Sequence, residues 1–256
     1  EPPWTLIPGS ELDFLISYIP DNIGSDESVI SIIGNDPILA EVETYQYGSG
    51  DVEKWFTHTW TQSEVPVLDV LWVIDNSGSM NSHQTNLSDN IGYFMSTFIA
   101  SNSDYNMSVI TTDSEYFSII VTQYHPDPAF EVAGLVVAGT GGAGMEKGIQ
   151  MAAQSLDNPQ FAGRGGSFFR EAAKLIVIFV SDEPDFSDGG WGSYVSFFDH
   201  LKPHGYFIPY GVIGDRPAGC STAQFGAGYW DLIDLYGGTW YSICASDWGR
   251  YNRGYC

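Results

Sequence analysis

Two continuous apolar segments, each followed by an aspartate, constrain the fold of this chain more than any other feature. The segment VLDVLWVI covers residues 67–74 and precedes Asp75, and the segment LIVIFVS covers residues 175–181 and precedes Asp182. Strands of a parallel sheet that are buried on both faces have nearly uninterrupted apolar sequences of this kind. Both segments are therefore expected to be central strands of a sheet that is covered on its two faces.

Strand and helix patterns alternate along the chain from residue 67 onward. Apolar residues at spacings of three and four over residues 87–99 predict an amphipathic helix. Further strands are predicted at 106–114, 116–124, 206–214 and 239–244, and further helices at 145–156, 192–202 and 223–238. This alternation predicts an α/β fold with a doubly wound, mostly parallel six-stranded sheet of the Rossmann-like kind.

The first 50 residues have a different pattern. Short segments of alternating apolar and polar residues at 12–20, 27–36 and 39–50 predict about three strands separated by turns. A β-sandwich normally needs more strands, so this module is either truncated at its start or completed by another part of the protein. We expect a partial β module over 1–50, a linker over 51–66 and the α/β domain over 67–256.

The charge balance restricts the partners of this chain. Nine Lys and Arg residues face 32 Asp and Glu residues, which gives a formal charge of −23. Nucleic acids and anionic membrane surfaces are repelled by such a chain, whereas cations and basic surfaces are attracted. The same charge also keeps a protein soluble without any specific partner.

No segment is suited to insertion into a membrane, since none has the run of about 20 apolar residues that a spanning helix needs. The chain begins with EPPWTLIPGS and has neither an initiator Met nor a signal peptide there. We therefore expect a mature product or an excised fragment of a longer chain.

Oxygen-bearing side chains cluster where the two central strands end. Asp75 and Asp182 should meet at the carboxyl edge of the sheet, where ligands bind in open α/β folds, and Ser77 and Ser79 follow in the first loop. Two carboxylates and two hydroxyls suit a hard cation such as Mg²⁺, Mn²⁺ or Ca²⁺ better than zinc. The alternative for Asp75 is that it caps the helix that follows.

Enzymatic motifs are weak in this sequence. GTGGAG at 139–144 satisfies the dinucleotide fingerprint G-x-G-x-x-G, but Asp157, the acid at the required distance, does not end a strand. His200 and His204 are four residues apart, but Pro203 interrupts the helix that would align them on a metal. Because no activated Ser or Cys is apparent either, we do not expect an enzyme.

The three cysteines lie close together near the end of the sequence, at positions 220, 244 and 256. Cys220 opens a helix-like stretch and Cys244 ends a strand-like one, so a disulfide could join them if these elements pack side by side. Two separately buried thiols are the alternative. A disulfide would indicate an oxidising compartment, and Cys256 has no evident partner.

The combination of DVLWVIDNSGSM at 69–80 with LIVIFVSDE at 175–183 resembles the von Willebrand factor type A (vWA) domain. That family carries a metal-ion-dependent adhesion site (MIDAS) built from an Asp-x-Ser-x-Ser loop and a distal Asp. The resemblance covers about residues 67–250, and GTGGAGMEKGI and GGTWYSICASDW are similar to a bacterial and phage-borne branch of the family. The stretch IGNDPILAEVETYQYGSG is similar to the end of the Ig-like repeats that precede such domains.

The resemblance implies that Asp75, Ser77, Ser79 and Asp182 bind a divalent cation, with Mg²⁺ first and Mn²⁺ or Ca²⁺ as alternatives. A fifth ligand, a Thr or Ser, normally comes from a middle loop. The corresponding position here is Ala143, which has no side-chain oxygen, and Thr140 is the nearest substitute.

Two further acidic residues and two cysteines complete what the sequence and the resemblance suggest. Glu146 and Glu183 could bind the cation through water or lie on solvated loops. In the branch that this chain resembles, the two cysteines equivalent to Cys220 and Cys244 commonly form a disulfide.

The function implied is metal-dependent binding of a protein at the cell surface or outside the cell, with an acidic group of the partner on the cation. The alternative is a structural part of a surface appendage or virion, in which neighbouring copies are the partners and the metal site is vestigial or stabilising.

Overall fold

The computed structural model describes residues 13, 15–17, 19, 24–34, 41–49, 55–56, 65–116, 119–158 and 168–245. The chain divides into two compact units, residues 1–65 and residues 66–255. In the described part of the chain, no helix has the length and apolar character needed to cross a membrane. Cys256, for which the sequence suggests no partner, lies outside the described residues.

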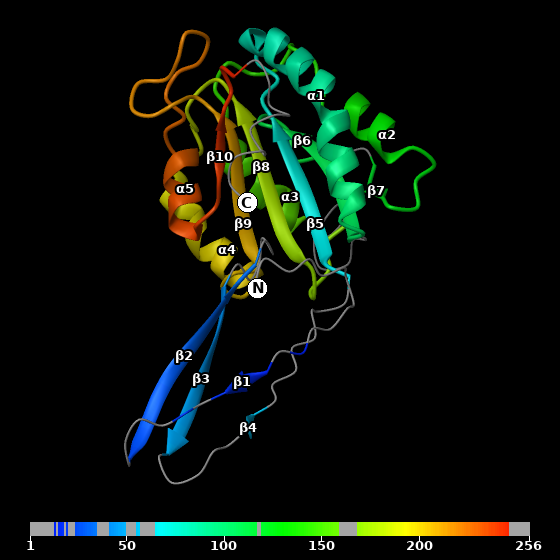
Figure 1. Ribbon diagram of the computed structural model, residues 1–256. Coiled ribbons are helices and arrows are strands. Elements are labelled where there is room, and N and C mark those ends of the chain that lie inside the picture. The colour runs from blue at the N-terminus through cyan, green and yellow to red at the C-terminus, as the bar shows by residue number, and fades with distance from the viewer. Residues whose placement is uncertain are drawn as a thin grey trace. The chain divides into compact units, whose positions relative to one another are not determined.

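The second unit is built on a six-stranded sheet with the strand order β10-β9-β8-β5-β6-β7 (Figure 1). All neighbouring strands are parallel except β6 and β7, which are antiparallel. This confirms the predicted doubly wound, mostly parallel sheet. The strands are β5 (Val67–Ile74), β6 (Asp104–Thr111), β7 (Val121–Thr122), β8 (Lys174–Ser181), β9 (Phe207–Ile213) and β10 (Trp240–Ser242).

Five α-helices are described in this unit. They are α1 (Asn81–Ala100), α2 (Pro128–Leu135), α3 (Gly148–Asp157), α4 (Val195–Leu201) and α5 (Tyr229–Tyr236), and two 3-10 turns, η1 (Gly78–Met80) and η2 (Trp191–Tyr194), precede α1 and α4. The prediction of a helix from residue 223 was wrong at its start. Gly228 has φ +85°, a conformation outside the helical region, so α5 begins only after it.

Two other elements differ from the sequence analysis. The strand predicted at 116–124 is reduced to the two residues of β7 in the described part of that segment, and α2 was not predicted. Helix α2 has an ordinary N-terminus, because the Asp127 carboxylate accepts the Phe130 N–H at 3.0 Å and Pro128 is the first helical residue.

Alternate side chains of β5 pack against helices on opposite faces of the sheet. Trp72 meets Phe94 of α1 edge to face, with ring centroids 5.3 Å apart. Leu71 and Val73 belong instead to a buried cluster that includes Ile149 of α3. The same cluster contains Phe198 of α4 and Tyr229, Trp230, Leu232 and Ile233 of α5. Burial on both faces explains why β5 has almost no polar residue.

The exception in β5 is Asp69, which is fully buried and paired with Arg170. The Arg170 Nε donates to Asp69 Oδ1 at 2.8 Å, and the Arg170 backbone N–H donates to Asp69 Oδ2 at 2.6 Å. The same guanidinium donates to Asp104 Oδ1 at 2.7 Å. Arg170 therefore joins the starts of β5 and β6, at the edge of the sheet opposite to Asp75.

The first unit contains two small antiparallel sheets. Strand β1 (Ile16–Ser17) pairs with β4 (Trp55–Phe56), and β2 (Ser25–Ile33) pairs with β3 (Glu41–Ser49). Strand β4 lies in the range 51–66 that the sequence analysis assigned to a linker. The domain boundaries and the Ig-like character of this module stay predictions.

Candidate metal centre

The strand order reverses at β5, because the chain continues from β5 to β6 on one side and later returns to β8 on the other. The carboxyl ends of β5 and β8 therefore form the topological switch point, where α/β sheets bind ligands. Asp75 follows β5 directly and Asp182 follows β8 directly. The backbone N–H of Asp75 donates to Val180 O at 2.9 Å, which holds the two strand ends together.

Asp75 is fully buried, and both of its carboxylate oxygens accept hydrogen bonds. Oδ1 accepts from the Ser77 backbone N–H at 2.8 Å, and Oδ2 accepts from the Ser181 hydroxyl at 2.6 Å. Neither η1 nor α1 has a side-chain cap, so the helix-cap alternative for Asp75 is wrong. The carboxylate is instead fixed in one orientation at the end of the strand.

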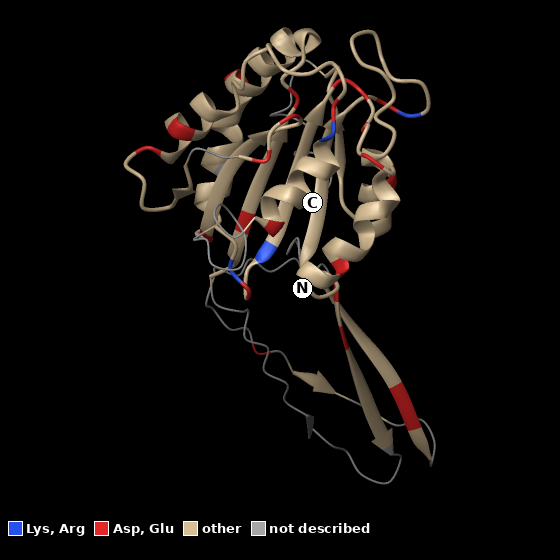
Figure 2. Cartoon of the chain, turned by 180° about the vertical axis from the view of Figure 1, so that it is seen from behind, with Lys and Arg blue, Asp and Glu red and all other residues tan. Residues whose placement is uncertain are grey.

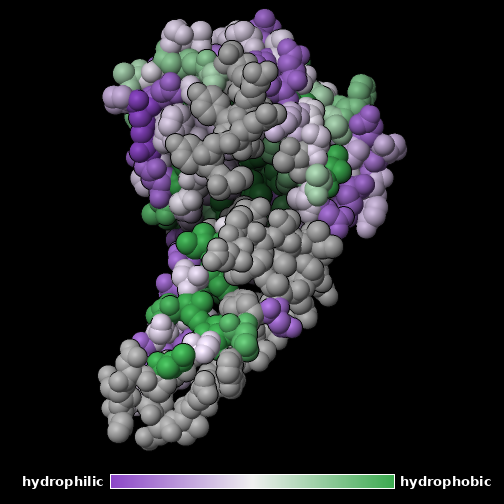
Figure 3. Space-filling view, viewed as in Figure 1, coloured by the Kyte–Doolittle hydropathy of each residue, from purple (hydrophilic) through white to green (hydrophobic). Residues whose placement is uncertain are grey.

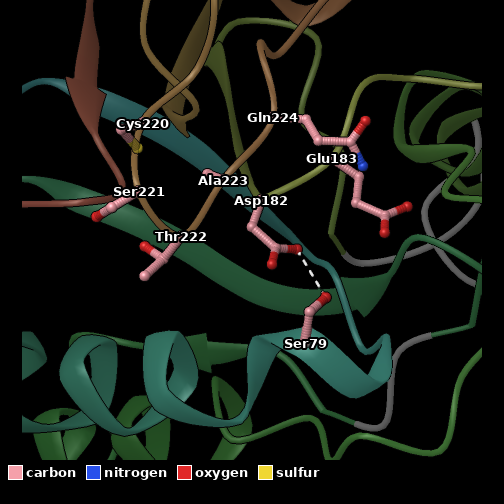
Figure 4. Close-up of a pocket in the computed structure, with 8 residues that line it drawn as sticks. All are labelled: Ser79, Asp182, Glu183, Cys220, Ser221, Thr222, Ala223 and Gln224. Carbon is pink, nitrogen blue, oxygen red and sulfur yellow. Dashed lines mark hydrogen bonds between the residues drawn. The ribbon is translucent and has the colours of Figure 1, made fainter.

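The two serines of the first loop connect it to Asp182. The Ser77 and Ser79 hydroxyl oxygens are 3.0 Å apart, and the Ser79 hydroxyl donates to Asp182 Oδ1 at 3.1 Å. Figure 4 shows the Asp182 carboxylate pointing toward Ser79. The structure thus brings Ser77, Ser79 and Asp182 into one hydrogen-bonded chain beside Asp75.

Gln84 in the first turns of α1 supports this loop, although the sequence analysis did not single it out. It is buried, and its amide Nε2 donates to Asp75 O at 2.8 Å and to Gly139 O at 2.7 Å. Its Oε1 accepts the Gly139 N–H at 3.1 Å. The sequence did contain a signal for this role. Gln84 precedes Leu87 by three residues, which places an amide on the apolar face of the helix.

Asn76 joins the first loop to the glycine-rich loop. Its backbone carbonyl accepts the Gly142 N–H at 2.8 Å, and its Nδ2 donates to Asp113 Oδ1 at 3.1 Å. A Cβ atom on Gly142 would lie 2.3 Å from Asn76 Oδ1, so a larger residue here would displace the Asn76 side chain. The glycine-rich loop therefore packs directly against the first loop of the site.

Thr140 and Ala143 lie in that loop and are both exposed. The backbone N–H of Ala143 donates to Asp113 Oδ2 at 3.1 Å. In the described part of the chain, no hydrogen bond links Thr140 to the four other candidate ligands. A role of Thr140 as the fifth ligand stays a prediction.

Glu146 and Glu183 have different surroundings. Glu146 is fully buried, so the expectation of a solvated loop is wrong for this residue. Its Oε2 accepts a hydrogen bond from the Thr112 hydroxyl, whereas its Oε1 is buried without a partner in the described structure. Glu183 is half-buried at the edge of a nearby pocket.

Carboxyl groups at this edge repel one another. Burial, followed by the charges of Asp75 and Glu183, raises the pKa of Glu146 to about 7. Burial and the Asp75 charge also raise the pKa values of Asp182 and Glu183. The charge of His83 acts in the opposite direction and lowers the pKa of Asp182. Figure 2 shows the predominance of Asp and Glu over the chain.

These residues fit a hard divalent cation. The available donors are the carboxylates of Asp75 and Asp182 and the hydroxyls of Ser77 and Ser79, which are all oxygen atoms. A cation would relieve the repulsion that raises the pKa values of the acids. The described residues contain no group of three or more His, Cys, Asp or Glu side chains close enough to hold a metal ion, so hydroxyls or water must supply the remaining ligands.

A pocket of about 330 Å³ lies beside Asp182 (Figure 4). It is lined by Ser79, Asp182, Glu183 and residues 220–224. Cys220 and Cys244, the pair that the resemblance implied, form a disulfide that holds this loop. Cys220 lies in the loop before α5 and does not open a helix. The Gln224 N–H donates to Asp182 O at 2.8 Å, which connects the loop directly to the candidate metal centre.

Residues 70–184 match the family model of the von Willebrand factor type A domain. This range begins within β5 and ends just after Asp182, so it contains the four residues that share the switch point. The six-stranded sheet with helices on both faces agrees with that fold. No curated protein sequence matches the chain.

Similar solved structures include proximal thread matrix protein 1 from the mussel byssus. One of its structures is 16% identical in sequence, with 70% of this chain and 43% of that chain covered and a TM-score of 0.43. A second one, which has a zinc-occupied MIDAS motif, is 16% identical, with 70% and 42% covered and a TM-score of 0.42. The present chain therefore spans about two fifths of the length of these proteins.

Proposed function

We propose that the part of the chain that matches the von Willebrand factor type A domain is a metal-dependent binding module and not an enzyme. A divalent cation, Mg²⁺ or alternatively Mn²⁺ or Ca²⁺, is held by Asp75, Ser77, Ser79 and Asp182. A cation in this site supplies an electrophilic centre for an oxygen atom of a partner. The observation that carries the proposal is the hydrogen-bonded chain Ser77–Ser79–Asp182 beside the buried Asp75.

The residues of the chain position such a cation. Ser181 and the Ser77 N–H fix the Asp75 carboxylate, and Ser79 orients Asp182. Ser79 is exposed, so the side of the site that it forms is open to a partner. An acidic side chain of a partner protein suits an open position on a divalent cation.

The proposed location is outside the cell, at a cell surface or on a virion. A disulfide between Cys220 and Cys244 supports an oxidising environment. We also propose that the first unit is part of an Ig-like module of the kind that precedes such domains in bacterial and phage-borne proteins.

Calorimetry with Mg²⁺, Mn²⁺ and Ca²⁺ tests the first step of the proposal. The chain should bind one cation, and Asp75→Ala should abolish binding. The second step is the binding of a carboxylate to the cation. It is tested by NMR relaxation of acetate methyl protons in the presence of the Mn²⁺-loaded chain. Fast relaxation that is lost in Asp182→Asn would show a carboxylate on the cation, whereas a chain that binds no cation would disprove the function.

A second candidate function is a structural role in an assembly of neighbouring copies, with a stabilising metal. The hairpin β2–β3 favours it, because an isolated two-stranded sheet is marginal in water. Val29 and Tyr45 are paired across this hairpin and are 46% and 53% exposed. Figure 3 shows apolar residues on the surface of the hairpin. Sedimentation over a concentration series should reveal self-association that Val29→Ser and Tyr45→Ser weaken, whereas a free binding module stays monomeric.

A further inference from the structure

Glu146 has an unusual environment for a carboxylate. Its side chain is fully buried, and its Oε2 accepts a hydrogen bond from the Thr112 hydroxyl. Its Oε1 is also buried and has no hydrogen-bond partner in the described structure. A buried carboxylate oxygen without a donor is energetically costly, and native structures provide such an atom with a donor, a water molecule or an ion.

Backbone contacts place Glu146 over the ends of the central strands. The Thr112 N–H donates to Ile74 O at 3.1 Å, and the Lys147 N–H donates to Thr112 O at 3.0 Å. The Phe186 N–H donates to Glu146 O at 2.6 Å. Glu146 is thereby held between the end of β6 and the segment that follows β8, and Ile74 is the residue before Asp75.

The charges that surround Glu146 are negative. Its pKa is raised by burial and by the carboxylates of Asp75, Glu183 and Asp113, while the Thr112 hydrogen bond acts in the opposite direction. Direct coordination by Glu146, Asp75 and Asp182 together is not indicated, because no three such groups in the described structure are close enough to share an ion. A water molecule between Glu146 and the cation satisfies both observations.

We propose that Glu146 accepts a hydrogen bond through Oε1 from a water molecule on the cation, and so replaces the contribution that Ala143 cannot make. This inference rests on the proposed function, since it requires a cation at Asp75 and Asp182. Glu146 is then a positioning residue of the centre, anchored by Thr112. Some residues act on a metal only through its ligands. Mutation of such a residue typically lowers the metal affinity by about 10- to 100-fold.

The test uses the full 256-residue chain and Mn²⁺ as the probe, with Glu146→Gln and the control Glu183→Gln. Both variants replace a carboxyl group near the site by a neutral amide, but only Glu146 is fully buried with an unpaired oxygen. Calorimetry should give a Kd for Mn²⁺ that rises at least about tenfold in Glu146→Gln. The Kd should rise about threefold or less in Glu183→Gln, because the charge of a partly exposed group is screened.

A second measurement separates a contact to water from an effect of charge. Oxygen-17 relaxation of water gives the residence time of the water molecules bound to Mn²⁺. This time should shorten in Glu146→Gln and stay at the wild-type value in Glu183→Gln. Thr112→Val, which removes the anchoring hydroxyl without changing the charge, should shorten it as well and provides a second variant if Glu146→Gln does not fold.

Three results would overturn the inference while leaving the proposed function intact. They are an unchanged Kd in Glu146→Gln, equal losses in Glu146→Gln and Glu183→Gln, or an unchanged water residence time with a raised Kd. If the wild-type chain binds no Mn²⁺, the proposed function itself fails and the inference with it. Mn²⁺ binding by the wild-type chain, measured first, distinguishes these cases.

Discussion

Ser79 and Asp182, which are 103 residues apart in the sequence, are joined by a hydrogen bond of 3.1 Å from the serine hydroxyl to the carboxylate Oδ1. Each residue follows one of the two central parallel strands, and the bond spans the switch point of the sheet. This contact links the two halves of the candidate metal centre.

Ser79→Ala should weaken binding of Mg²⁺ and Mn²⁺ by roughly tenfold or more, because it removes both an oxygen donor and the group that orients Asp182. Its stability should change little, since Ser79 is exposed. Calorimetry and thermal unfolding measure the two quantities. Ser96→Ala, on an exposed position of α1, is the control and should leave both unchanged. Equal affinity in both variants would exclude Ser79 as a ligand.

The stability of the metal-free chain should depend on Asp185 in a defined pH range. Burial raises the pKa of Asp185 from 3.8 to about 6, although the Ile149 N–H donates to it at 3.1 Å. Because the folded chain binds this proton more tightly than the unfolded chain, the contribution of Asp185 to the free energy of unfolding falls as the pH rises from about 4 to about 6.

Asp185→Asn should therefore gain stability relative to the wild type over this pH range, as measured by urea unfolding in the presence of a chelator. Asp188→Asn is the control, and its effect on the pH dependence of stability should have the opposite sign. The reason is that the hydrogen bond from Lys147 lowers the pKa of Asp188. Asp188 therefore contributes stability above its unfolded pKa that is lost as the pH falls. Parallel curves for wild type and Asp185→Asn would contradict the prediction.

Arg170→Ala should destabilise the chain by about 3–5 kcal/mol, because it leaves the fully buried Asp69 without its partner. Lys147→Ala breaks an ion pair with Asp188, whose side chain is 70% exposed. That control should cost about 1 kcal/mol or less. Urea unfolding at pH 7 measures both, and a similar small loss in the two variants would show that the Asp69 pair is not important for stability.

Gly142→Ala should cost about 1–2 kcal/mol and weaken cation binding, because the new Cβ displaces the Asn76 side chain from Asp113. Gly141→Ala is a matched control, since a Cβ at that position has no atom within 4 Å. Thermal unfolding and calorimetry with Mn²⁺ measure the effects. If both alanines are tolerated equally, the contact between the two loops does not support the site.

Removal of the Cys220–Cys244 disulfide should reduce the free energy of unfolding by about 3 kcal/mol in the chain-entropy model, for a sequence separation of 24 residues. Cation affinity should be retained in the double Cys→Ser variant, because the four ligands follow β5 and β8 and do not belong to the loop. Denaturant unfolding and calorimetry measure the two quantities. Complete loss of cation binding would instead make this loop part of the metal centre.

The sequence predicted an element well where the residues of a single segment are enough to define it. A strand buried on both faces must be apolar along its whole length, so β5 and β8 were recognisable from 67–74 and 175–181 alone. Strand β7 was not, since only two residues of the 116–124 segment are assigned to it. Its pairing depends on the edge of β6, which the segment does not encode.

The sequence by itself determined that two aspartates end central parallel strands, because the carboxyl ends of such strands meet at one edge. It also supplied the oxygen-only chemistry through Ser77 and Ser79. Only the tertiary structure decided that Glu146 is buried and that Gln84 joins two loops, since burial depends on which distant segments cover a residue. A short loop sequence does not indicate whether water or protein surrounds it. For Glu146, burial by distant segments is what determines its proposed role.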